Sequence, residues 1–149
     1  MTTIACSQKE IACDLQFTLN NTVITKGKTK IYKVKPHELH CNEEFLVGFA
    51  GIASDISDLM DYYTSPDLYK TPPKSRGLTG LALTKSGKIF VFDSPLSWVR
   101  IDAKFAAIGS GSQVAYGALH VGATPKEAVE AASKVDVYTG CGIKTLSFT

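Results

Sequence analysis

Apolar and polar residues alternate along most of the first half of the chain, as expected for half-buried strands. A polar break at residues 7–10 and a turn-forming pair at residues 20–21 separate the first runs. Because only a short polar segment joins the first two runs, we expect them to form a hairpin. The strands predicted in this half are Thr2–Cys6, Ile11–Gln16, Thr22–Thr25, Thr29–Val34 and Glu44–Ala50.

A helical pattern follows the last of these strands. Apolar residues recur three or four positions apart from Ile52 to Tyr63, with serines and aspartates on the opposite face. Pro66 ends this helix, because the residue before a proline disfavours helical conformation. The stretch from Ser65 to Gly77 contains three prolines and no periodicity, so we expect an irregular surface loop there.

The second half begins with strands and ends with two adjacent helices and a last strand. One helix follows residues 109–112 and ends at Gly122, and a capping box with proline at residues 124–127 begins the next. Runs of strands followed by a helix pair favour an α+β layered sandwich. The strands predicted here are Leu81–Thr84, Lys88–Phe92, Ser97–Ile101, Phe105–Ile108 and Ile143–Phe148.

Composition narrows the classes of protein. With 149 residues, 44% of them apolar and 20% charged, the chain is typical of one globular domain, predicted to span residues 1–149. The formal charge of +2 argues against nucleic acid as a partner. No apolar run approaches the roughly 20 residues of a membrane span, and the first residues do not resemble a signal peptide. We therefore expect a cytoplasmic protein, with no membrane partner and with reduced, structural cysteines.

Thr2 is the first candidate for chemistry. Removal of Met1, which is common before a small residue, would leave Thr2 with a free α-amine. The hydroxyl and the amine would then share one residue, and an amine with an ordinary pKa of about 7.7–8.0 suits a general base near neutral pH. Because many proteins begin with Met-Thr, this pair points to a nucleophile only together with other motifs.

Four further motifs follow at characteristic spacings. Asp14 closes the second predicted strand, and a lysine-rich segment leads to Lys30. Val-Gly-Phe-Ala-Gly at residues 47–51 precedes the first helix, and Gly-Ser-Gly-Ser at residues 109–112 opens the second. Together with Thr2, this series resembles the proteasome β-subunit family of N-terminal-nucleophile hydrolases, in particular its HslV-type bacterial peptidases.

The resemblance covers most of the chain, from Thr2 to about Asp61 and from about Thr84 to Phe148. It implies an α+β fold arranged as a four-layer αββα sandwich of the N-terminal-nucleophile hydrolase type. Between about Asp61 and Gly77, this chain has its proline-rich segment. The HslV-type chains have there the rest of one long helix and a second helix. We therefore expect a shortened version with one helical layer reduced.

The resemblance also implies a role for each motif. Thr2 matches the nucleophile, and Lys30 matches a buried lysine whose positive charge keeps the nearby amine unprotonated. Asp14 matches the carboxylate that holds this lysine. Gly48 matches the glycine whose backbone N–H stabilises the oxyanion, and Ser110 matches a serine beside the amine.

Each of these positions except Thr2 has a structural alternative. Lys30 would otherwise be a solvated strand lysine, and Asp14 a turn or edge carboxylate. Gly48 would serve close packing at a strand end. Ser110 would cap the helix that follows it.

A segment near the C-terminus, residues 136–140, combines features of two branches of the family. Proteasome β-subunits carry an aspartate here, which Asp136 matches, and this match implies hydrogen bonds around the catalytic amine. HslV-type chains have Tyr-Thr here instead, which Tyr138 and Thr139 match. The backbone carbonyls of Ser133, Asp136 and Thr139 match those that bind a monovalent cation such as Na⁺ in HslV-type enzymes. An ordinary helix end is the alternative, and no organic cofactor is expected.

The activity implied by the resemblance is that of a threonine-type endopeptidase acting on peptides or unfolded proteins. The implied assembly is a homo-oligomeric ring that works with an ATPase unfoldase. The reduced helical layer motivates one alternative, a catalytically silent assembly or binding protein with the same fold. A second alternative is an N-terminal-nucleophile amidase that acts on small amides.

Overall fold

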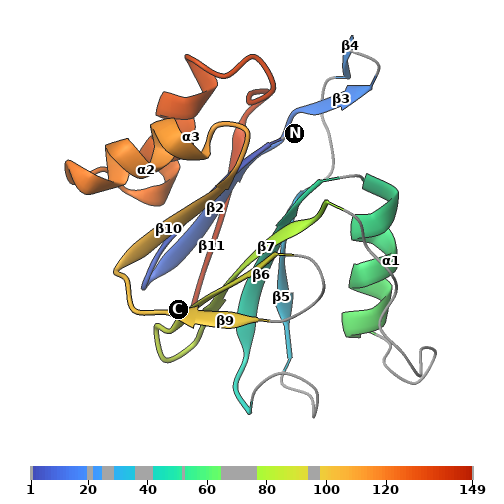
Figure 1. Cartoon of the computed structure of the whole chain (residues 1–149), viewed down its shortest axis with the longest axis vertical. Helices are drawn as coiled ribbons and strands as arrows, with labels where there is room; N and C mark the ends of the chain where they lie inside the picture. The colour runs from blue at the N-terminus through green and yellow to red at the C-terminus, as the bar shows by residue number, and fades with distance from the viewer. Residues whose placement is uncertain are drawn as a thin grey trace.

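The computed structural model describes residues 2–19, 22–24, 29–35, 42–51, 53–64, 77–93 and 98–148. These residues form two antiparallel sheets, one separate hairpin and three helices, so the predicted α+β class is confirmed. Figure 1 shows the two sheets between the helices.

The four-stranded sheet joins the beginning of the described chain to its end. Its strands, in spatial order, are β10 (Phe105–Gly109), β1 (Thr3–Ser7), β2 (Glu10–Asp14) and β11 (Ile143–Ser147). The hairpin predicted from the first two apolar runs is confirmed, since β1 and β2 pair antiparallel. Because neighbouring strands run in opposite directions, the start of β1, the ends of β2 and β10 and the start of β11 meet at one end of this sheet.

The five-stranded sheet follows chain order. Its strands are β5 (Ile31–Val34), β6 (Phe45–Ala50), β7 (Thr79–Thr84), β8 (Ile89–Asp93) and β9 (Val99–Ile101). Every residue of β6 is buried, as expected for a nearly continuous apolar run at the centre of a sheet.

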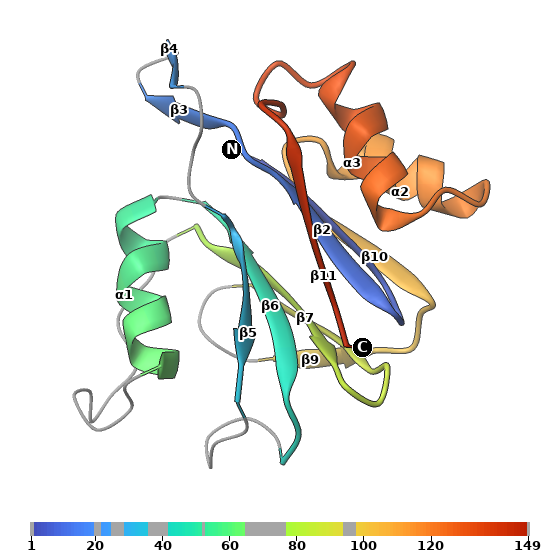
Figure 2. The same cartoon turned by 180° about the vertical axis from the view of Figure 1, so that it is seen from behind.

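The second strand is shorter than predicted, and a separate hairpin follows it. The strand expected over residues 11–16 ends at Asp14, and β3 (Phe17–Leu19) then pairs with β4 (Thr22–Ile24). The break has a local cause: the Asp14 carboxylate accepts a hydrogen bond from the N–H of Gln16, a turn that competes with continued strand pairing. Figures 1 and 2 show this hairpin projecting beyond the end of the two sheets.

The three helices are α1 (Ala53–Thr64), α2 (Ser112–His120) and α3 (Pro125–Ser133). The predicted capping box of α3 is present, with Thr124 and Glu127 bonding to each other's backbone N–H groups. Gly122, with φ +101°, follows the end of α2 in the left-handed conformation that suits glycine.

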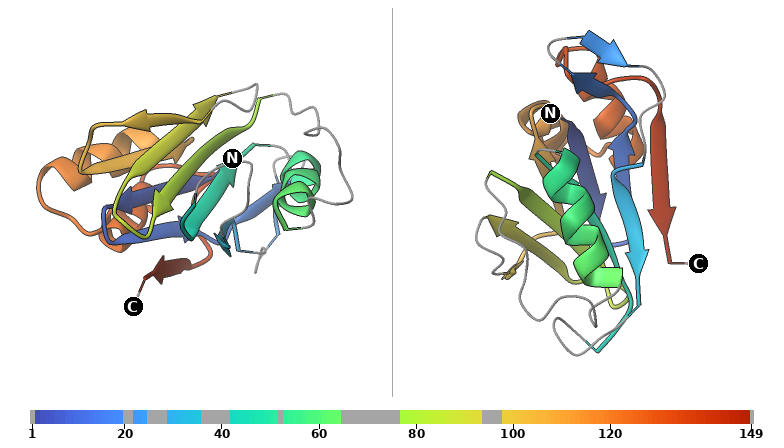
Figure 3. Two further views of the ribbon diagram at one scale, coloured as in Figure 1. Left: turned by 90° about the horizontal axis from the view of Figure 1, so that it is seen from below. Right: turned by 90° about the vertical axis from the view of Figure 1, so that its right-hand side faces the viewer.

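Three apolar clusters place these elements in layers. Small residues such as Ala5, Ala12 and Ala128 join α2 and α3 to the four-stranded sheet, and Ile4, Ile11 and Leu81 belong to the cluster between the two sheets. A third cluster joins the five-stranded sheet to α1. The order is therefore helix pair, sheet, sheet, helix, and Figure 3 shows α1 crossing the outer face of the five-stranded sheet.

Most of the predicted proline-rich loop, residues 65–76, lies outside the described residues, as does the segment that defines the reduced helical layer. Among the residues that are described, no helix combines the length and the hydropathy that a membrane crossing requires.

Candidate active site

The sheet topology brings the candidate residues together at one end of the four-stranded sheet. Thr2 immediately precedes β1, Asp14 ends β2, and Ser110 follows β10. The turn at residues 136–142 leads into β11 at the same end. Lys30 lies just before β5, so the second sheet supplies the cation.

Thr2, Lys30 and Asp14 are in direct contact. The Lys30 Nζ donates to Thr2 Oγ1 at 2.5 Å and to Asp14 Oδ1 at 2.8 Å, and Thr2 Oγ1 donates to the same carboxylate oxygen. Thr2 is 2% exposed, the Asp14 side chain 0% and the Lys30 side chain 13%. Lys30 is therefore not a solvated strand lysine, and Asp14 does not lie on an edge strand. The turn alternative for Asp14 holds in part, because its carboxylate also accepts from the N–H of Gln16. The group is a buried ion pair around a hydroxyl.

The remaining bonding capacity of Asp14 is also used. Its Oδ1 accepts from the N–H of Thr3 at 3.1 Å, and its Oδ2 accepts from the N–H groups of Gln16 and Gly140 at 3.2 and 3.1 Å. A buried carboxylate needs such partners to offset the loss of hydration. These bonds fix its orientation toward Lys30 and Thr2.

Gly48 packs tightly in the core beside the site. It lies opposite Ile31 in β5, and a Cβ placed on it would be 2.9 Å from Cδ1 of Ile4 and 3.0 Å from Cγ2 of Ile31. The close-packing alternative therefore holds for this position. The role of its backbone N–H toward an oxyanion stays a prediction.

Asp136 and Ser110 form a second group next to Thr2. The Ser110 hydroxyl donates to Asp136 Oδ2 at 2.5 Å and lies 3.3 Å from the carbonyl oxygen of Thr2. The hydroxyl of Thr139 donates to the same carboxylate oxygen at 2.6 Å, and the N–H of Tyr138 donates to Oδ1 at 3.2 Å. Partial burial raises the pKa of Asp136, but these hydrogen bonds lower the pKa by a larger amount. The net pKa therefore lies below its ordinary value.

The helix-capping alternative for Ser110 is wrong. The N-cap of α2 is Gly111, and no side chain caps this helix end. The Ser110 hydroxyl is instead committed to Asp136, because a bond to a carboxylate is stronger than one to a neutral group.

Thr3 and Gln16, which lie at this end of the sheet, were not predicted from the sequence as site residues. The hydroxyls of Thr3 and Thr139 lie 2.7 Å apart, and these residues are 0% and 3% exposed. Gln16, which is 5% exposed, donates from Nε2 to the carbonyl of Val137 at 2.9 Å and so ties the hairpin to the turn. Gln16 could have been noticed as a polar residue at the end of an apolar run, whereas nothing in the sequence pattern distinguishes Thr3.

The predicted cation site is not tested by this geometry. The Asp136 carbonyl accepts from the N–H of Thr139 at 3.1 Å, which leaves one lone pair, and its side chain is directed to other partners. The prediction names the backbone carbonyls of Ser133, at the end of α3, and of Asp136 and Thr139 beyond it, because carbonyl oxygens suit a hard cation. The cation stays a prediction. Within the described ranges, no three His, Cys, Asp or Glu side chains cluster as metal ligands.

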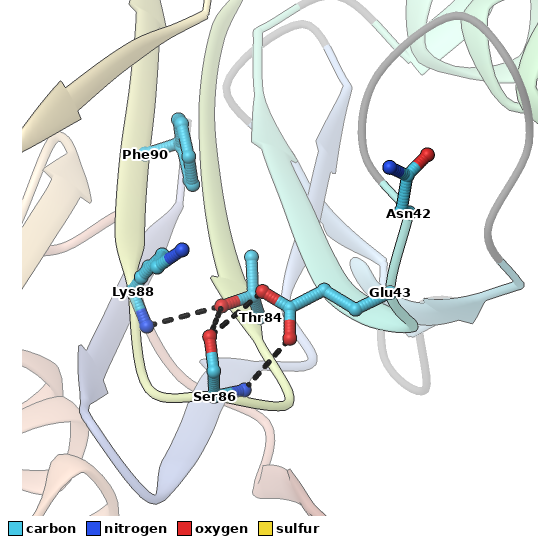
Figure 4. Close-up of a pocket in the computed structure, with 6 residues that line it drawn as sticks. All are labelled: Asn42, Glu43, Thr84, Ser86, Lys88 and Phe90. Atoms are coloured by element: carbon cyan, nitrogen blue, oxygen red, sulfur yellow. Dashed lines mark hydrogen bonds between the residues drawn. The ribbon is translucent and has the colours of Figure 1, made fainter.

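A hollow of about 420 Å³ lies at the opposite end of the five-stranded sheet, around the β7–β8 turn (Figure 4). The Glu43 carboxylate there accepts from the N–H and the hydroxyl of Ser86 at 3.1 and 2.7 Å. Partial burial raises the pKa of Glu43, but its hydrogen bonds lower it by more. The hollow is lined by Asn42, Glu43, Thr84, Ser86, Lys88 and Phe90.

Neither a protein-family model nor a curated protein matches the chain. Among solved structures, the chain is similar to BPH from Thiobacillus denitrificans in complex with epoxomicin. That match has 19% sequence identity and a TM-score of 0.73, and it covers 99% of this chain and 97% of the other. The structure titled BPH alone matches at 18% identity with a TM-score of 0.72, covering 99% and 96%.

A third solved structure, eukaryotic HslV from Trypanosoma brucei, matches at 18% identity with a TM-score of 0.65, covering 99% of this chain and 100% of that one. The TM-scores and the coverage establish the fold, and identities of 18–19% show nothing about the chemistry. The chain has the proteasome β-like fold of HslV and BPH, as its sequence motifs predicted.

Proposed function

We propose that the chain is a threonine-type endopeptidase whose nucleophile is the hydroxyl of Thr2, released as the first residue when Met1 is removed. The observation that carries the proposal is the contact of Thr2 Oγ1 with both Lys30 Nζ and the Asp14 carboxylate. The fold shared with BPH, a protein solved with epoxomicin, supports it.

The proposed reaction begins with attack of Thr2 Oγ1 on a peptide carbonyl carbon. The α-amine of Thr2 takes the hydroxyl proton, directly or through one water, while the charge of Lys30 stabilises the negative charge developing on Oγ1. Asp14 keeps Lys30 oriented. The backbone N–H of Gly48 would stabilise the tetrahedral oxyanion.

Collapse of the tetrahedral intermediate breaks the C–N bond. The departing amine receives the proton held by the Thr2 amine, and the acyl group remains as an ester on Oγ1. A water molecule, deprotonated by the same amine, then attacks the ester carbonyl. The C–Oγ1 bond breaks, the acid is released, and Oγ1 takes the proton back from the amine. Ser110 and Asp136, which adjoin the Thr2 backbone, would position that amine through both steps.

The assembly and the cation belong to the same proposal. Peptides or unfolded proteins would be the substrates of a homo-oligomeric ring that works with an ATPase unfoldase. The carbonyls of Ser133, Asp136 and Thr139 would hold a monovalent cation that stiffens the turn, and no step of the reaction depends on it.

Peptide turnover by the purified chain tests the proposal. Intact mass first verifies that Thr2 is the first residue, and a fluorogenic peptide library then supplies the substrate. We expect Thr2→Ala to abolish turnover with the circular dichroism spectrum retained, and Lys30→Ala to do nearly the same. The matched control is Lys33→Ala, because Lys33 lies three positions away, is 56% exposed and pairs only with Glu44 among the described ion pairs. Turnover that persists in Thr2→Ala would end the proposal.

The second candidate, a catalytically silent protein of the same fold, is favoured by the three prolines of residues 65–77, where the resemblance implies helix. Retention of Met1 by intact mass, together with no covalent adduct after incubation with epoxomicin, would support this candidate. Turnover of small amides without turnover of peptides would instead indicate the amidase alternative.

A further inference from the structure

The hydroxyl pair of Thr3 and Thr139 has a defined hydrogen-bond direction. A hydroxyl has one hydrogen to donate, and Thr139 donates its hydrogen to Asp136 Oδ2 at 2.6 Å. In the 2.7 Å contact between the two threonines, Thr3 Oγ1 must therefore be the donor. The hydrogen bonds run in one direction, from Thr3 through Thr139 to the carboxylate.

The same reasoning fixes the proton of Ser110. Its hydroxyl lies 2.5 Å from Asp136 Oδ2 and 3.3 Å from the Thr2 carbonyl oxygen, and one hydrogen cannot serve both. The shorter bond to the charged acceptor prevails. Since the hydrogen of Ser110 points to Asp136, its lone pairs remain for a donor at the start of the chain.

The hydroxyl pair is sealed from solvent. Thr3 is 0% exposed and Thr139 3%, and a Cβ placed on Gly111 would lie 2.1 Å from Thr3 Oγ1 and 3.2 Å from Thr139 Oγ1. Glycine at position 111 is thus the residue that lets the two hydroxyls meet under the start of α2. Water cannot readily replace either partner. Loss of the Thr3 hydroxyl removes the donor to Thr139, and loss of the Thr139 hydroxyl leaves that of Thr3 without its acceptor.

We propose that Thr3 is a positioning residue for the reaction at Thr2, acting through Thr139 and Asp136 on the orientation of the Ser110 hydroxyl. Thr3 contacts neither the Thr2 hydroxyl nor a substrate in this arrangement, and its effect passes through three hydrogen bonds. The inference rests on the proposed function, because a positioning role requires a reaction at Thr2.

The test compares Thr3→Val with Thr3→Ser in steady-state peptide hydrolysis. Valine keeps the shape of threonine and removes the hydroxyl, whereas serine keeps the hydroxyl. We expect kcat of Thr3→Val to fall about 3- to 10-fold, the usual worth of one hydrogen bond, with KM unchanged. Thr3→Ser should restore kcat to within about twofold of wild type. A fall caused only by loosened packing would not be restored by serine.

A matched control is Thr84→Val. Thr84 is another buried strand threonine, 2% exposed, whose hydroxyl is bonded to Ser86 and to the N–H of Lys88 at the far end of the other sheet. Its kcat should equal that of wild type. An equal fall in Thr84→Val and Thr3→Val would show a general stability effect and overturn the proposal.

A double-mutant cycle tests the path through Thr139. Because Thr3 acts only through Thr139, the double variant Thr3→Val/Thr139→Val should have the kcat of Thr139→Val alone. Independent, multiplying losses would overturn the proposal. If Thr3→Val does not fold, Thr3→Ala removes the same hydroxyl with a smaller side chain and carries the same expected loss of kcat and the same refutation.

The two proposals fail in distinguishable ways. If wild type with Thr2 verified as first residue hydrolyses no substrate, the proposed function fails and this inference fails with it. If wild type is active, Thr2→Ala is inactive and Thr3→Val retains full kcat, only the role of Thr3 is overturned.

Discussion

Asp14 and Asp136 lie beside the same short turn, and consecutive residues of that turn bind them: Gly140 donates to Asp14 and Thr139 to Asp136. Their surroundings differ. The Asp14 side chain is fully buried and paired with Lys30, whereas Asp136 is partly exposed and bonded to neutral donors. The difference teaches that one carboxylate is the counter-charge of a buried cation, while the other is bonded by neutral groups that would also bond to a neutral acceptor.

The largest expected effect is on the buried carboxylate. We expect Asp14→Asn to lower the free energy of unfolding by about 3–5 kcal/mol, because Lys30 would be left without its counter-charge in a mostly buried position. Urea unfolding followed by circular dichroism measures this. The control is Glu44→Gln, which breaks the exposed Lys33–Glu44 pair and should cost less than about 1 kcal/mol. Equal losses in the two variants would contradict the contrast.

A smaller effect is expected at the partly exposed carboxylate. Asp136→Asn should lower the free energy of unfolding by about 1 kcal/mol, since the bonds from Ser110 and Thr139 persist to a neutral acceptor and solvent screens the lost charge. The same urea titration checks it. A loss as large as that of Asp14→Asn would show that the two carboxylates are equivalent.

The pH dependence of stability sharpens the comparison further. The folded-state pKa of Asp136 lies below its ordinary value of 3.8, so its contribution to stability is present above about pH 4 and is lost as the pH falls through the folded pKa. Wild type should therefore lose more stability than Asp136→Asn between pH 5 and about pH 3. Parallel urea midpoints for the two proteins over this range would refute the prediction.

The smallest expected effect concerns α2, the helix that begins beside the hydroxyl pair. A Cβ on Gly117, inside this helix, would meet no atom within 4 Å, so Gly117→Ala should raise the free energy of unfolding by about 0.5–1 kcal/mol. Gly111→Ala, at the N-cap of the same helix, should lower it, because its Cβ would collide with Thr3 Oγ1. The sign of these two changes in thermal unfolding separates the crowded end of the helix from the open one.

Much of the fold could be predicted because apolar runs mark the buried strands. Within the described residues, the predicted strands and helices occur, with ends that shift by a few residues. The main error was at Gln16, where an aspartate side chain, rather than a change in hydrophobicity, ends the strand. Side-chain bonds to the backbone leave no periodic trace in the sequence.

One part of the candidate site could be predicted from the sequence and another part could not. The resemblance gave Thr2, Asp14 and Lys30, and the structure brings these three into contact. Thr3 and its bond to Thr139 could not be foreseen, because a contact between residues 136 positions apart depends on the pairing of whole strands. The competing capping role of Ser110 was equally consistent with the sequence, and only the distance to Asp136 decides between them.

The donors to Asp14 come from residues 2, 3, 16, 30 and 140, so residues more than a hundred positions apart are needed to complete the bonds of one carboxylate. During translation, the donors at residues 2 and 3 emerge from the ribosome long before the donor at residue 140. Nascent chains therefore carry Thr2 and Lys30 for most of their synthesis without the Gly140 amide that completes the set. The order of translation itself delays assembly of this end of the molecule until residue 140 has emerged.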